Sequence, residues 1–215
     1  MANLNYYNNY ILHLTLGASL IGATFLILNA KGNAWGQVLT VVFSILYGII
    51  SYSNAYYGEM ITYLGMTAAI AIGSVISWIR NPAEEGKNVV KVNNLKIREY
   101  VLLLFLGIII TVIFYYILEA FNTNSLLLST ISVFTSFIAS YLTLRRSEYY
   151  ALAYAANDIV LILLWLIAME NNSGYISVVI CFVVFLINDL YGYYSWLKMK
   201  KIQTTIEIKS NLKNK

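Results

Sequence analysis

Residues 81–99, NPAEEGKNVVKVNNLKIRE, form the longest polar stretch between the apolar parts of this chain. The stretch holds four of the fourteen Lys and Arg residues and the only proline. Charged side chains are costly inside hydrocarbon, so a segment with this composition must lie in water beside any membrane that the flanking parts enter. It provides the reference from which the side of every other connection is assigned.

Seven apolar stretches flank this polar segment, three before it and four after it. Each has about the 20 residues that a helix needs to cross a hydrocarbon core. They cover residues 11–29, 34–53, 59–80, 100–119, 125–144, 148–169 and 174–197. The chain is 60% hydrophobic and 11% charged, whereas soluble domains have about 25% charged residues. We therefore predict an all-α integral membrane protein with seven transmembrane helices.

Placing the connections alternately on two faces puts all the basic residues on one face. They are Lys31, Arg80, Lys87, Lys91, Lys96, Arg98, Arg145, Arg146 and the six lysines from Lys198 onward. The opposite face receives the N-terminal segment and the connections at 54–58, 120–124 and 170–173, which have no Lys or Arg. The positive-inside rule makes the basic face cytoplasmic, with the N-terminus outside and the C-terminus inside.

An internal repeat accompanies this charge pattern. A shift of 118 residues superposes Asn54 on Asn172, Tyr57 on Tyr175, Ser77-Trp78 on Ser195-Trp196 and Arg80 on Lys198. We therefore expect two parallel three-helix repeats, 1–80 and 125–200. Residues 81–124 would hold the cytoplasmic loop and an inverting fourth helix, and 201–215 a basic cytoplasmic tail. Such repeats in transporters place the substrate near the midplane, between the halves.

Two kinds of role are open to the aromatic and polar residues of the apolar stretches. Trp78, Trp196, Tyr57 and Tyr175 lie near helix ends, which is typical of an interfacial aromatic belt. Polar residues deeper in the stretches could hydrogen-bond and stack on a heterocycle or sugar. The alternative is that buried Asn and Asp only join helices. The candidate site residues are Tyr150, Tyr154, Asn157 and Asp158 on one helical stripe, Asn188 and Tyr191 on the seventh helix, and Trp35, Gln37 and Tyr47 in the first half.

Several functional classes have no support in the sequence. There is no glycine-rich phosphate loop, His13 is the only histidine, and Cys181 is the only cysteine. No nucleophile stands near a base with triad-like spacing, so we expect neither an enzyme nor a metal or cofactor site. The pI near 9.0 comes from charges at helix ends, which meet lipid, so we expect no nucleic-acid partner. The expected partners are a small molecule and the bilayer.

The sequence resembles the PnuC family of bacterial nicotinamide riboside transporters. The resemblance is strongest from Tyr57-Gly58-Glu59 to Trp78-Ile79-Arg80, from Arg145-Arg146-Ser147-Glu148-Tyr149 to Asn157, and from Asn188-Asp189 to Ser195-Trp196. It implies a three-plus-one-plus-three fold, similar to SWEET proteins but full length in one chain. It also implies facilitated diffusion through the bacterial cytoplasmic membrane, without ATP hydrolysis, and trapping of the substrate by a separate cytoplasmic kinase.

One family motif differs in this chain. The Trp-x-x-Trp motif of the riboside transporters, which begins seven residues before an Asn, falls on Tyr150 and Ala153 when that Asn is Asn157. Nicotinamide riboside is our first choice of substrate, and a deoxynucleoside, thiamine or riboflavin are the alternatives. Proton coupling through Asp158 or Asp189, a homo-oligomer, and a non-transporting scaffold or sensor also stay open.

Overall fold

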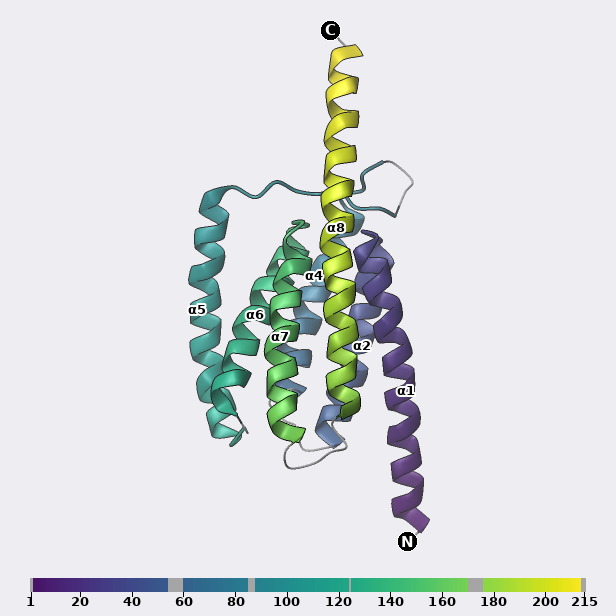
Figure 1. The fold of residues 1–215 in the computed structure, drawn as a ribbon, viewed down its shortest axis with the longest axis vertical. Coiled ribbons are helices and arrows are strands. Elements are labelled where there is room, and N and C mark those ends of the chain that lie inside the picture. Colours follow the sequence, from purple (N-terminus) through teal and green to yellow (C-terminus); the bar gives the residue numbers. More distant parts are fainter. Residues whose placement is uncertain (1, 54–59, 85–87, 124, 170–175, 214–215) are drawn as a thin grey trace.

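The computed structural model describes residues 2–53, 60–84, 88–123, 125–169 and 176–213, and these form a bundle of helices (Figure 1). The elements are α1 (Ala2–Ala30), α2 (Ala34–Ser53), the π-helix η1 (Thr62–Thr67) continued by α4 (Ala68–Ile79), α5 (Ile97–Ala120), α6 (Leu126–Leu144), α7 (Tyr150–Met169) and α8 (Ile176–Lys213). Within the described ranges six segments are long and apolar enough to cross a membrane, and α1 adds a shorter apolar part, Gly17–Ala30. The predicted all-α membrane fold with seven helical segments is confirmed.

Six of these described segments form a ring that follows the chain order. Helix α1 packs on α2, α2 on η1 and α4, α4 on α6, α6 on α7, α7 on α8, and α8 on α1. Exchanging α1, α2 and α4 for α6, α7 and α8 reproduces the same set of contacts. Helix α5 lies outside the ring (Figure 1), with its main contacts on α6. It exposes apolar side chains such as Phe105 and Ile108. An apolar exposed surface of this kind suits contact with lipid tails.

Two tryptophans join the halves of the ring at the end where the basic residues lie. Trp78 Nε1, at the end of α4, donates to the Thr143 carbonyl of α6 at 2.9 Å. Trp196 Nε1, on α8, donates to the Asn29 carbonyl of α1 at 2.8 Å. The two indole rings are 5.3 Å apart between centroids. Each indole adds a second donor to a carbonyl of a last helical turn, which also accepts a backbone N–H, from Arg146 at Thr143 and from Gly32 at Asn29.

The belt prediction is therefore wrong for Trp78 and Trp196, which are 1% and 0% exposed. A belt tryptophan places its N–H in interfacial water, whereas these indoles find protein acceptors and can be buried completely. Tyr57 and Tyr175 lie outside the described residues.

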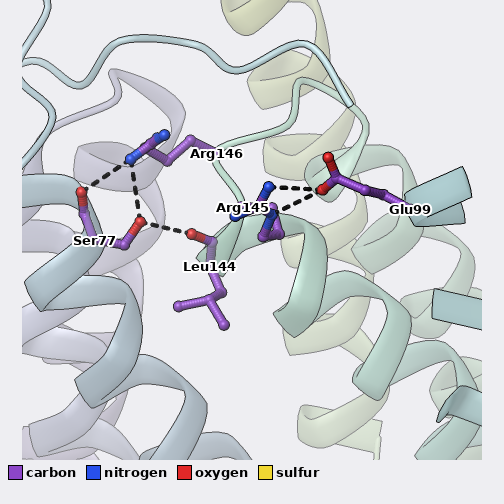
Figure 2. Close-up of polar contacts among 5 residues, drawn as sticks. All are labelled: Ser77, Glu99, Leu144, Arg145 and Arg146. Carbon is purple, nitrogen blue, oxygen red and sulfur yellow. Dashed lines mark hydrogen bonds and ion pairs between the residues drawn. The ribbon is translucent and has the colours of Figure 1, made fainter. Parts of the chain in front are cut away.

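Charged residues add further links at the same end (Figure 2). Arg145 donates from Nε and Nη2 to Glu99 Oε2 of α5, at 3.1 and 2.7 Å. Arg146 Nη1 reaches the carbonyl and hydroxyl oxygens of Ser77 at 3.2 and 3.3 Å, and Ser77 in turn donates to the Leu144 carbonyl. Burial and the charge of Arg145 lower the pKa of Arg146 from its ordinary value, yet a guanidinium stays charged at neutral pH. The contacts with Ser77 offset part of the cost of its burial.

The polar connection between α4 and α5 crosses this end of the bundle. Val90, which is fully buried, donates its N–H to the Gly32 carbonyl at 2.9 Å. Gly32 turns the chain from α1 into α2 with a φ of +67°, and a Cβ there would lie 2.8 Å from Met199 Cε. The turn therefore favours glycine through its positive φ, whereas the Met199 side chain could move aside.

Helix α8 is longer than the sequence analysis expects. The predicted tail after residue 200 continues the helix to Lys213. No Gly or Pro follows Gly192 to end the helix. The Gln203 amide accepts a hydrogen bond from Val92 N at 2.9 Å and donates to Val90 O at 3.0 Å. This link holds the α4–α5 connection against the extension.

Candidate functional site

The ring contains a cavity of about 150 Å³, lined by α1, α2, η1, α4, α6, α7 and α8. Its lining is both polar and aromatic, although the surrounding helices are mostly apolar. A concave site with a few convergent polar groups is the usual form of a small-molecule site. The cavity is therefore the candidate functional site.

One face of α2 carries a stripe of polar residues that lines the cavity. Gln37, Thr40, Ser44 and Tyr47 are spaced three, four and three residues apart, so they share one side of the helix. All four line the cavity. Apolar residues on the opposite side of α2, such as Val42, Ile45 and Ile49, consequently face outward, the reverse of the pattern in a soluble protein.

Helix α6 carries a matching stripe. Ser129, Ser132, Ser136, Ser140 and Thr143 are spaced three, four, four and three residues apart, and all line the cavity. These residues are not among the candidates predicted from the sequence, because each hydroxyl by itself is ordinary in a membrane helix. The period of the stripe was the signal that could have identified the inner face of α6.

The first half of the ring holds a buried amide network. Gln37 Nε2 donates to Asn29 Oδ1 at 2.8 Å, and Asn29 Nδ2 donates to Thr40 Oγ1 at 3.3 Å. Gly36 permits this close packing of α1 and α2, because a Cβ there would lie 2.2 Å from Asn29 Oδ1. The network fixes which amide atoms face the cavity.

An aromatic cluster forms the adjoining wall. The rings of Phe43 and Tyr47 are stacked at 5.6 Å between centroids, and Tyr63 lies 4.4 Å from Tyr47. Phe25 of α1 packs on Phe43 at 5.2 Å. Tyr63 comes from the π-helix η1, and π-helical turns recur at functional sites because they change the direction of side chains. We name Phe25, Phe43, Tyr47 and Tyr63 the aromatic wall.

The second half supplies hydrogen-bonding groups. Asn157 Oδ1 of α7 accepts from Thr135 at 2.8 Å and from Ser132 at 3.2 Å, both on α6. Tyr154 shares a hydrogen bond of 3.1 Å with Ser140. The Asn157 carbonyl oxygen is thus engaged by α6, and its amide group is oriented by those two bonds.

Two acidic side chains complete this side of the cavity. Asp158 of α7 and Asp189 of α8 are 4% and 5% exposed, and both line the cavity. Their carboxyl groups adjoin each other, and Asn188 precedes Asp189 on α8. We name Asp158 and Asp189 the carboxyl pair.

The structure brings together most of the candidate residues from the sequence. Tyr47, Gln37, Tyr150, Tyr154, Asn157 and Asp158 all line the cavity. Asn188 lies behind the lining, beside Asp189. Trp35 and Tyr191 are 59% and 52% exposed and do not line it. Tyr191 stands two residues after Asp189, about 200° around the helix, which turns it away from the cavity.

Comparisons with known proteins agree with this fold. Residues 12–198 match the model of a family described as nicotinamide mononucleotide transporter. The nicotinamide riboside transporter PnuC of Neisseria mucosa is 25% identical over 189 residues, which cover 86% of this chain and 72% of that protein. The PnuC of Haemophilus influenzae is 23% identical, covering 87% and 80%. The crystal structure of the vitamin B3 transporter PnuC has a TM-score of 0.74 at 22% identity and covers 94% of this chain and 87% of its own.

Proposed function

Because this chain belongs to the nicotinamide mononucleotide transporter family, we propose that it carries nicotinamide riboside or a similar nucleoside-like vitamin precursor. The observation that carries the proposal is the cavity within the helical ring, which has an aromatic wall on one side and hydrogen-bonding groups on the other. A nucleoside has one flat ring and one sugar, and this lining offers a surface for each. The curated names of the two PnuC relatives support the same substrate.

The mechanism we propose is facilitated diffusion by alternating access. The reciprocal contacts of the ring support a parallel repeat in which α1, α2 and α4 move as one body against α6, α7 and α8. The Trp78 and Trp196 bonds cross between these bodies. Opening the cavity toward the basic end would therefore break both bonds. The substrate moves down its own concentration gradient as the halves move, so the cycle needs no ATP.

Topology and partners follow from the charge pattern. We propose that the basic end faces the bacterial cytoplasm, with the N-terminus outside and the C-terminus inside. A separate cytoplasmic kinase would phosphorylate the released nucleoside, because an added phosphate charge prevents its return. Assembly into a homo-oligomer stays a prediction, which a mass measurement in detergent tests.

A non-transporting scaffold is the rival function. Its polar residues would only pair between helices, whereas here many of them line a cavity. Because Tyr150 and Ala153 stand where the Trp-x-x-Trp motif would be, thiamine, riboflavin and deoxynucleosides stay alternative cargoes. The aromatic wall of the first half could stack on the flat ring of any of them, in place of the tryptophans on α7.

Uptake into proteoliposomes tests the proposal. We expect saturable entry of labelled nicotinamide riboside, with protein-free vesicles of the same lipid as the control. Unlabelled thiamine, riboflavin and deoxynucleosides, added as competitors, rank the alternatives. Uptake no faster than in empty vesicles for every compound would overturn the proposed function.

A further inference from the structure

The carboxyl pair places negative charge at the centre of the ring. Asp158 and Asp189 come from neighbouring helices, and each is more than nine-tenths buried at the cavity wall. Two carboxylates that adjoin each other in a buried site repel, so only one of the two is readily charged at a time. The pair therefore carries at most one negative charge.

The described lining of the cavity supplies no positive charge to balance it. Among the described residues that line the cavity there is no Lys, Arg or His. Tyr150 and Tyr154, which line the same cavity beside the pair, carry neutral hydroxyl groups. An unbalanced charge inside a membrane protein is costly, and such residues generally mark a ligand or ion path.

One oxygen of the pair also has no partner. Asp158 Oδ2 is buried and, within the described structure, forms no hydrogen bond. Buried polar atoms are nearly always satisfied by protein, water or ligand. This oxygen thus marks a position at the cavity wall where a positively polarised group of a ligand is expected.

A metal ion is a poor candidate for that position. In the described parts of the chain no group of three His, Cys, Asp or Glu residues is placed to hold a metal. The aromatic wall is the other large surface of the cavity, and aromatic faces attract organic cations. Carboxylate and aromatic surfaces together suit a flat ring that carries a positive charge.

We propose that the carboxyl pair is the counter-charge for a substrate ring with a fixed positive charge, such as an N-ribosylated pyridinium. This inference rests on the proposed transport function and narrows its substrate class. Nicotinamide riboside and thiamine have cationic rings, whereas deoxynucleosides and riboflavin are neutral. The pair therefore selects the first two, and one negative charge on the pair matches one positive charge on the ligand.

Two ligands of nearly equal shape provide the test. Nicotinamide riboside is cationic, and its 1,4-dihydro form is neutral but keeps the carboxamide and the ribose. Binding of both to the purified protein is measured by calorimetry. We expect the wild type to bind the cation at least about tenfold more tightly, in line with a buried charge pair. Asp158→Asn and Asp189→Asn, which keep the side-chain shape, should bring the ratio close to one.

The matched control is Glu119→Gln, which removes an exposed carboxylate from α5 outside the ring. It should leave the ratio unchanged. Retained binding of the neutral ligand by the Asn variants shows that they are folded. If a variant does not fold, the ratio of cation to neutral-ligand affinity in the wild type still tests the inference. A wild-type ratio near one, or a ratio that both Asn variants preserve, overturns the inference.

The source of the positive charge is tested in the same preparation. Neutral-ligand binding that requires sodium, or uptake of the neutral ligand driven by a proton gradient, would assign the charge to a small cation and overturn the inference. If both Asn variants bind the cation as tightly as the wild type does, the inference fails but the proposed function does not. Binding of neither ligand by the wild type overturns the proposed function itself.

Discussion

The two halves of the ring share a frame but differ in what they present to the cavity. Each half ends in a buried tryptophan that donates to a carbonyl near the end of the other half's first helix. Both halves line the cavity with hydroxyl groups and aromatic rings, and the first half adds the aromatic wall and the uncharged amides of Asn29 and Gln37. Among the described lining residues, carboxyl groups come from the second half alone, as the carboxyl pair beside Asn157.

The two halves can therefore have equivalent helix contacts while their cavity-lining side chains differ. The bonds that close the ring involve backbone carbonyls, which every residue has, so they tolerate sequence change in either half. Cavity-lining side chains are free to diverge because they do not hold the halves together. A ligand with unlike ends would meet a different half with each end.

The largest effect is expected from removing stacking in the first half. Tyr47→Ala with Tyr63→Ala should weaken binding of cationic and neutral rings alike, by roughly 10- to 100-fold, since stacking contributes about 1–3 kcal/mol per ring. Calorimetry with nicotinamide riboside and its dihydro form measures both. Tyr116→Ala, on the outer helix α5, is the matched control. A loss confined to the cationic ligand would contradict the division of roles between the halves.

A smaller effect is expected from the second half's amide. Asn157→Ala removes one proposed ligand contact and the side-chain acceptor of Ser132, whereas Thr135 keeps the carbonyls of its own helix as acceptors. Such losses cost about 1–3 kcal/mol, so initial uptake at low substrate concentration should fall by roughly tenfold. Asn94→Ala, at the exposed basic end, should transport normally. If Asn157→Ala equals wild type in uptake and affinity, the site assignment fails.

The shared frame predicts equal and moderate effects. Trp78→Phe and Trp196→Phe each keep an aromatic ring but delete one bond between the halves. Each should lose about 1 kcal/mol of stability, which thermal unfolding in detergent measures. The two shifts should agree. A shift in only one of the variants would show that the halves are not equivalent in packing.

The smallest effect concerns the exposed aromatic residues. Trp35→Ala and Tyr191→Ala change side chains that do not line the cavity. Uptake and affinity should stay within about twofold of wild type, because surface changes seldom exceed 0.5 kcal/mol. A tenfold loss in either variant would place that residue at the substrate after all.

The sequence was sufficient for the fold because the membrane constrains it strongly. Apolar stretches of helical length allow few alternatives, and the described helices match all seven, with α1 starting earlier and α8 ending later than expected. The extra length of α8 depends on Gln203 bonding to the α4–α5 connection. That contact joins residues more than 100 positions apart, which periodicity does not reveal.

The site was only partly predictable for a related reason. Polar residues such as Asn157 and Gln37 were conspicuous because they are expensive in a membrane. Phe43 and Tyr63 were not, since aromatic residues are equally at home against lipid. Trp78 and Trp196 were misassigned because their position near helix ends is shared by belt residues. Only the fold shows that the neighbouring helix offers each indole an acceptor.

Counterflow tests whether this chain moves a cationic nucleoside-like vitamin precursor without a coupled energy source. Proteoliposomes are loaded with unlabelled nicotinamide riboside and diluted into a trace of the labelled compound, with no ion gradient. We expect a transient accumulation of label above the outside concentration, which decays as the internal pool runs out. Label that never exceeds the level in protein-free vesicles would contradict it.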